Sequence, residues 1–170
     1  EVLANQFQPE GRWTKTATDG FAFSAQGEAS IITWSIVPDD TTIPGLMNQS
    51  AVGSNFRSWM ASLYGGSISG AAADQPWFDI FKSAFEEMAA TCGLTLVYEP
   101  IDDGVSVNSS NLGELGRRGD IRIAARGLDG NSGNLAIAFP PDHGDMIFDS
   151  SDGIFKIISG SSIRLFNTIT

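Results

Sequence analysis

The sequence has a single cysteine, few basic residues and no long apolar run. One cysteine, Cys92, excludes an intrachain disulfide framework and a cysteine-based zinc site. Lys and Arg number 10 against 20 Asp and Glu, and the net charge of −10 repels nucleic acids and anionic membranes. No stretch approaches the roughly 20 apolar residues that a membrane-spanning helix needs. We therefore expect neither nucleic-acid binding nor a membrane span.

The composition is typical of one globular domain. Hydrophobic residues make up 42% of the 170 residues and charged residues 18%, which is enough apolar material for a core. Residues 1–28 are rich in Gly, Thr and Gln without sustained periodicity, and we interpret them as an extended N-terminal arm. Residues 29–170 show no internal repeat or linker and form one expected domain. The chain starts at Glu1 without a basic and apolar leader, so any targeting segment has been removed or was never present.

Five segments have the pattern of β-strands. Apolar, β-branched residues run from Ile31 to Val37 and stop at Pro38, which predicts a strand buried on both faces. Four more strands are predicted in LTLVYEP, DIRIAARG, NLAIAFPP and DMIFD, which span 94–100, 120–127, 134–141 and 145–149.

Two helices and the opening of a third are also predicted. Apolar residues recur at helical spacing over 55–64, where glycines end the helix. Asp74 as N-cap and Pro76 in the first turn start a second helix that stops at Gly93. In SSIRLFNTIT, 161–170, apolar residues recur every third position. This order of elements describes a mixed sheet with helices packed against it.

Serine- and cysteine-dependent hydrolysis have little support. The only histidine, His143, lies in the turn PPDHGD without an adjacent nucleophile, which favours a solvated turn residue over a catalytic base. No Gly-x-Ser-x-Gly motif is present. Cys92 falls at the end of an amphipathic helix, where a buried thiol is the favoured role.

Two acidic, glycine-bearing loops offer oxygen ligands. They are LDGNSGN at 128–134 and FDSSDG at 148–153, and such loops suit a hard cation with about six to eight oxygen contacts. Neither has the spacing of an EF-hand, and each alone is also common turn chemistry. Paired across one hairpin of predicted strands, the two loops are a candidate calcium site.

Five segments in this order and spacing carry a family resemblance: RWTKTATDG, ITWSIVPD, FDIFKSAFEEMAATCGLTLVYEP, GDIRIAARGLDGNSGNLAIAFPP and GDMIFD. Together they resemble the secreted bacterial relatives of the matrixins, which are metzincin zinc endopeptidases. The similarity runs from Arg12 to Thr170 and is most specific over 119–149. It implies an α/β (α+β) fold, the metzincin-like upper subdomain, with a twisted mixed five-stranded sheet, one antiparallel edge strand and two or three packed helices. It also implies a secreted, extracellular protein.

The resemblance places the catalytic residues beyond this sequence. In the family, the last strand leads to a helix with His-Glu-x-x-His-x-x-Gly-x-x-His, whose imidazoles bind zinc and whose glutamate acts as general base. SSIRLFNTIT resembles the start of that helix, so the first zinc-binding histidine is expected directly after Thr170. Catalytic zinc would then belong only to the complete domain, and this chain alone is expected to be inactive.

The resemblance also implies two metal expectations. The implied calcium ligands are Asp129, Gly130, Ser132, Asn134, Asp149 and Asp152. Gly130 and Ser132 would contribute main-chain carbonyls. A structural zinc that animal matrixins hold nearby is not expected, because the matching positions are the apolar Ile137 and Ile147.

A substrate-binding strand is implied at residues 134–139. This segment matches the edge strand along which the family's substrate peptide lies antiparallel, and Asn134, Leu135 and Ala136 are the expected substrate contacts. The alternative is an ordinary edge strand of the sheet.

Two functions from different classes remain open. In the first, the chain is part of a secreted zinc endopeptidase, and its partners are a peptide or protein substrate and the remaining C-terminal portion of the same precursor. In the second, a peptidase-derived domain is an inactive structural or binding module of an extracellular assembly, which uses its arm and edge strand for contact. A His-Glu-x-x-His directly after Thr170 would support the first, and a stop codon there the second.

Overall fold

The computed structural model describes residues 13–20, 29–108 and 110–156. The predicted helix at 161–170 and most of the predicted arm lie outside these residues. Within the described part of the chain, every strand predicted from the sequence is present, along with both of the predicted helices that fall inside it.

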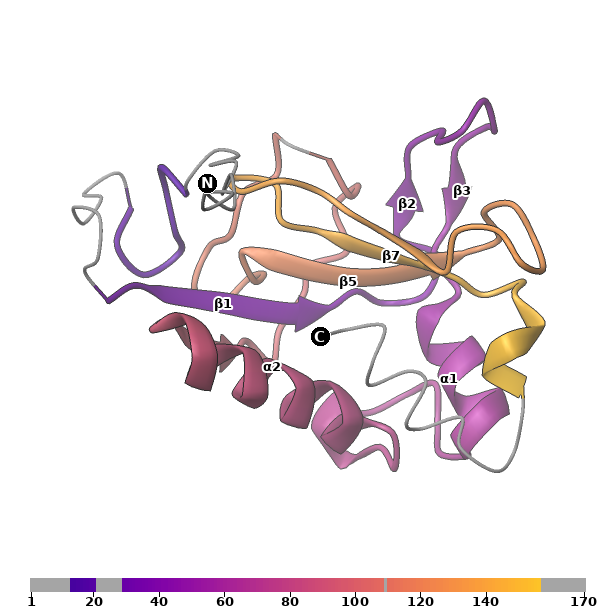
Figure 1. The fold of residues 1–170 in the computed structure, drawn as a ribbon, viewed down its shortest axis with the longest axis horizontal. Coiled ribbons are helices and arrows are strands. Elements are labelled where there is room, and N and C mark those ends of the chain that lie inside the picture. Colours follow the sequence, from indigo (N-terminus) through magenta and orange to yellow (C-terminus); the bar gives the residue numbers. More distant parts are fainter. Residues whose placement is uncertain (1–12, 21–28, 109, 157–170) are drawn as a thin grey trace, which may run out of the picture.

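A five-stranded mixed sheet forms the centre of the fold (Figure 1). The strand order is β4–β1–β5–β7–β6, and all neighbours are parallel except β6, which pairs antiparallel with β7 at one edge. The bounds are Ile31–Ile36 for β1, Thr95–Tyr98 for β4, Ile121–Arg126 for β5, Ala136–Ala138 for β6 and Met146–Asp149 for β7. The predicted α+β fold, with a mixed five-stranded sheet and an antiparallel edge strand, is confirmed.

Two α-helices pack against one face of this sheet (Figure 1). They are α1, Phe56–Tyr64, which contacts β5, and α2, Phe78–Cys92, which contacts β4. Their aromatic rings form the main core with Trp34 of β1, whose ring lies 4.6 Å from that of Phe85. Burying one such side chain contributes about 1.5–3 kcal/mol, so the apolar face of each helix determines where the helix packs.

Helix α2 begins later than predicted. Asp74 is not its N-cap, because this residue ends a short 3-10 helix, Ala72–Asp74. Gln75 is extended, with φ −90° and ψ 145°, as is typical of a residue that precedes a proline. This extended residue separates the 3-10 helix from α2, which begins at Phe78. The predicted end is confirmed, since Gly93 adopts a left-handed φ of 69° directly after the last helical residue.

The first turn of α1 is capped by a distant carboxylate. Asn55, the residue before the helix, makes no side-chain capping bond. Instead, Asp39 accepts the amide of Arg57 at 2.7 Å and that of Ser58 at 2.9 Å. A negative charge there complements the free amides and the positive end of the helix dipole, so Asp39 fixes α1 to the end of β1.

The other face of the sheet carries a small hairpin that the sequence did not predict. It consists of β2, Thr42–Ile43, and β3, Val52–Gly53. Two-residue strands are too short to produce a periodic pattern, which explains the omission. Figure 1 shows the hairpin at the C-terminal ends of β5 and β7. Its Ile43 belongs to a second apolar cluster with Val37, Val107, Ala124, Leu128 and Ile147.

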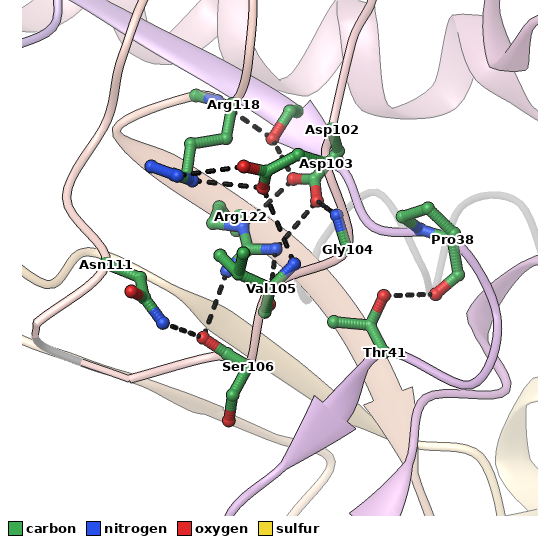
Figure 2. Close-up of polar contacts among 12 residues, drawn as sticks. Pro38, Thr41, Asp102, Asp103, Gly104, Val105, Ser106, Asn111, Arg118 and Arg122 are labelled. Carbon is green, nitrogen blue, oxygen red and sulfur yellow. Dashed lines mark hydrogen bonds and ion pairs between the residues drawn. The ribbon is translucent and has the colours of Figure 1, made fainter.

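A buried ion pair holds the polar loop between β4 and β5 on the sheet (Figure 2). Nη2 of Arg122 lies 2.7 Å from Oδ1 of Asp102, and both side chains are 1% exposed. The guanidinium also donates to the carbonyls of Val105 and Ser106, and the hydroxyl of Ser35 donates to Asp102. These extra hydrogen bonds offset the cost of removing both charges from water.

Candidate functional site

The two predicted acidic loops meet at one end of the sheet. The loop after β5 and the loop after β7 leave from the C-terminal ends of neighbouring parallel strands. Figure 1 shows both loops at the end of the sheet where α1 and the β2–β3 hairpin also lie. The sequence predicted that the loops pair across one hairpin, and the antiparallel strands β6 and β7 form that hairpin.

Asp149, the last residue of β7, joins the two loops. Its side chain is fully buried, and its carboxylate accepts the amides of Leu128 at 3.0 Å, Gly130 at 3.1 Å and Ser151 at 2.8 Å. Burial acts to raise the pKa of Asp149, but hydrogen bonds from the Ser151 hydroxyl and from the amides of Leu128, Ser151 and Asp129 outweigh it, and the pKa is lowered. An ionised Asp149 therefore fixes the course of the loop after β5.

Asp152 and Asp129 make similar contacts. Asp152 is buried and accepts the amide of Ser132 at 3.1 Å and that of Ile154 at 2.8 Å. Asp129 accepts the main-chain amide of Asn134 at 3.0 Å and its side-chain amide at 2.7 Å. All six residues of the predicted calcium site thus lie in, or are bonded to, one pair of joined loops.

These acidic side chains do not surround a common point. Among residues 13–20, 29–108 and 110–156, no group of three or more His, Cys, Asp and Glu side chains could hold a metal ion. The oxygens of Asp129, Asp149 and Asp152 are directed at amide hydrogens instead. Carboxylate and carbonyl oxygens are the ligands that calcium prefers, so the donor chemistry suits calcium, but a bound ion would have to displace some of these amide contacts.

The register of β6 decides which of its main-chain groups are available. The amide of Phe139 donates to the carbonyl of Asp145 at 3.0 Å, and the amide of Asp149 donates to the carbonyl of Leu135 at 2.9 Å. In an antiparallel ladder, residues that bond to the neighbouring strand alternate with residues whose N–H and C=O point away from it. Ala136 and Ala138 are in the second set.

The three predicted substrate contacts therefore differ in availability. Ala136 presents its main chain to the open edge of the described sheet. The carbonyl of Leu135 is bonded to β7, and the amide of Asn134 is bonded to Asp129. Ala138 is the second residue whose main chain lies on the open edge. The sequence analysis did not name it, because only the register of the strand pair identifies it.

Ile137 and Ile147 lie opposite each other in the β6–β7 pair. Ile147 is 1% exposed and belongs to the second apolar cluster, against which Ile137 packs. At the positions where animal matrixins are expected to hold zinc, these side chains make an apolar contact that contributes to the core.

His143 is not the solvated turn residue that the sequence analysis favoured. Its side chain is 16% exposed, and its ring stacks on Phe139 with centroids 4.1 Å apart. Nε2 lies 3.3 Å from Oδ2 of Asp145, at ion-pair distance. The turn between β6 and β7 folds this ring back onto the strand end, and a sequence pattern does not show that contact.

Cys92 was predicted to be buried, and this prediction is wrong. The thiol is exposed and lies in the last turn of α2. The buried residues of α2 end at Phe85, so the C-terminal turns of the helix extend past the core. Helical periodicity indicates which face is apolar but not how far along the helix the sheet reaches.

Two buried carboxylates at the opposite end of the sheet were not singled out. Asp120 accepts the amides of Thr33 at 2.8 Å and Ala17 at 2.7 Å, and Asp145 accepts the amide of Arg122 at 2.9 Å. Burial raises the pKa of both, and these hydrogen bonds offset it only in part. Each residue follows a glycine at the start of a strand, but that dipeptide alone is ordinary turn chemistry.

Neither the models of protein families nor the curated proteins give a match. Within the part of the chain that the structure describes, no helix is long and apolar enough to cross a membrane.

Proposed function

We propose that this chain is the calcium-binding and substrate-strand part of a secreted, matrixin-like zinc endopeptidase that hydrolyses peptide bonds in extracellular proteins. The observation that carries the proposal is the position of β6, an antiparallel edge strand that starts in the joined acidic loops. An open strand edge can accept an extended peptide, and the hydrogen bonds between Asp129 and Asn134 hold the start of that strand in place. The resemblance to matrixins over residues 12–170 supports the same function.

In this proposal the substrate peptide adds to β6 as an antiparallel strand. The main-chain groups of Ala136 and Ala138 would bond to the peptide, since the register directs them away from β7. The small alanine side chains leave the edge accessible. Main-chain bonds supply affinity that does not depend on the peptide's sequence, and side-chain contacts then supply specificity.

The hydrolytic step needs groups that the described residues do not supply. His143, the one histidine, packs against Phe139 and Asp145 at the other end of β6. The resemblance places three zinc-binding histidines and a general-base glutamate directly after Thr170. Zinc bound there would activate a water molecule and stabilise the oxyanion, while the residues of this chain would position the peptide.

The complete gene product tests the proposal. The codons after Thr170 are read for His-Glu-x-x-His, and the purified product is assayed for hydrolysis of an unfolded protein. The zinc chelator 1,10-phenanthroline should abolish hydrolysis, whereas its non-chelating 1,7 isomer should not. A stop codon directly after Thr170, or activity that resists the chelator, would contradict the proposal. The stop codon would favour the inactive binding module instead.

Calcium binding needs a separate measurement. If the joined loops bind calcium, the ion should raise the melting temperature, and free calcium at 100 times its Kd should add about 2.7 kcal/mol to the free energy of unfolding. Asp152→Asn, which keeps the side-chain volume but removes the charge, should greatly reduce this rise. A melting temperature that EGTA leaves unchanged would overturn the calcium assignment.

A further inference from the structure

The tip of the β2–β3 hairpin is fastened to the loop after β5. Arg126, at the end of β5, is 5% exposed and donates to the Gln49 side-chain carbonyl at 2.8 Å and to the Pro44 carbonyl at 3.3 Å. The Gln49 amide group in turn donates to the carbonyl of Leu128. A buried guanidinium bonded at both sides of the tip gives the hairpin a defined position beside the acidic loops.

The tip of the hairpin carries an exposed apolar side chain, Met47. Met47 and Asn48 both adopt a left-handed φ, of 51° and 66°, and so form the sharp turn at the tip. The Met47 residue is 47% exposed, and its Sδ lies 4.0 Å from Nδ2 of Asn134, the residue from which the chain enters β6. Non-glycine residues held in a left-handed conformation cluster at sites that contact ligands, and Met47 at this turn is exposed and available for such a contact.

The direction of the strand decides which part of a bound peptide meets Met47. A peptide antiparallel to β6 runs from the end of β6 near Phe139 toward its beginning near Asn134. The C-terminal half of such a peptide would leave the strand edge beside Asn134, whose side chain Met47 contacts.

We propose that Met47 is a specificity-determining residue for the substrate, and that it selects an apolar or aromatic side chain in the C-terminal half of the peptide. This assignment rests on the proposed endopeptidase function. A thioether side chain adapts its shape and contacts aromatic rings favourably. The neighbouring carboxylate of Asp129, which holds Asn134, disfavours an acidic side chain at the same place.

Cleavage profiles of the complete gene product test this assignment. Peptides that vary at single positions C-terminal to the cleaved bond are compared for the wild type and for Met47→Ala. At one position kcat/KM should fall about tenfold for apolar and aromatic side chains, whereas peptides with Gly or Ser there should change less than about twofold.

Two further variants separate the contact from general damage. Gln49→Ala removes the tether of the hairpin tip and should weaken the same preference, because Met47 is then no longer held beside Asn134. Ile68→Ala, which truncates an exposed apolar residue between α1 and α2, is the control and should leave the profile unchanged. Hydrolysis with an unaltered profile in Met47→Ala overturns this assignment alone. A wild-type product that hydrolyses no peptide overturns the proposed function and the assignment together.

Discussion

Single carboxylates determine the course of several loops in this protein. Asp39 holds the start of α1, Asp149 and Asp152 hold the acidic loops, and Asp142 holds residues 13–20. Each accepts at least two hydrogen bonds from amides or hydroxyls, and bonds to a charged acceptor are roughly twice as strong as neutral ones. The sequence showed that acidic residues are frequent in the loops, but not which amides each of them would bind.

Asp149→Asn should destabilise the protein by about 2 kcal/mol, because the amide group that replaces one carboxylate oxygen would face hydrogen-bond donors. The comparison is made by urea denaturation in EGTA, so that any bound calcium does not contribute. Glu87→Gln, a similar change at an exposed position of α2, is the control and should have no measurable effect. A loss below about 0.5 kcal/mol in Asp149→Asn would contradict the role of this carboxylate.

Elements with long periodic patterns were predicted well, and short ones were not. The strands β1 and β5 and the helix α1 appear close to their predicted bounds, because burial against the core selects their residues. The hairpin β2–β3 and the 3-10 helix before α2 were missed. The position of the hairpin depends on contacts with distant residues, such as that of Gln49 with Arg126, and the 3-10 helix is only three residues long. The loop between β4 and β5 is polar in sequence, yet a buried ion pair, Asp102 with Arg122, fixes it on the sheet.

Arg122→Met should cost about 3–5 kcal/mol in unfolding free energy, because it leaves Asp102 charged and buried without its partner. The matched control is Arg117→Met, which removes ion pairs of a half-exposed arginine with Asp103 and Glu114 and should cost no more than about 1 kcal/mol. Denaturant unfolding measures both values. Limited proteolysis should also detect loosening of residues 102–108 in Arg122→Met, and equal stability of the two variants would contradict this role.

At the scale of the whole molecule, the first described residues close the far end of the sheet. Asp142, in the turn between β6 and β7, accepts the Thr14 hydroxyl at 2.6 Å and also the amides of Thr14 and Lys15. Asp120, at the start of β5, accepts the amide of Ala17. Segments more than a hundred residues apart are thus joined, and the turn at the end of the proposed substrate strand is held by the beginning of the chain.

This contact should respond to acid. Burial acts to raise the pKa of Asp142, but the bonds from Thr14 and Lys15 outweigh it and lower the pKa. The contact is therefore complete above the unfolded value of about 3.9 and is lost as the pH falls through the lower folded pKa. The amide NMR signals of Thr14 and Lys15 should shift with pH, with a midpoint below about pH 3.9. A midpoint at about pH 3.9 or higher would contradict the contact. In the control variant Asp142→Asn this titration should be absent.

The sequence by itself determined the elements and their general arrangement. Strand and helix patterns depend on which side chains are buried, and that information is local, so five strands, two helices and two acidic loops at one end of the sheet could be predicted. The tertiary structure alone decided the partners of the polar groups. Whether Asp149 faces amides, whether Ala136 and Ala138 rather than Leu135 face the open edge, and whether Met47 reaches Asn134 all depend on register and on contacts between distant residues. Such contacts depend on which residues lie close together in space, and the spacing of residues along the chain does not specify that.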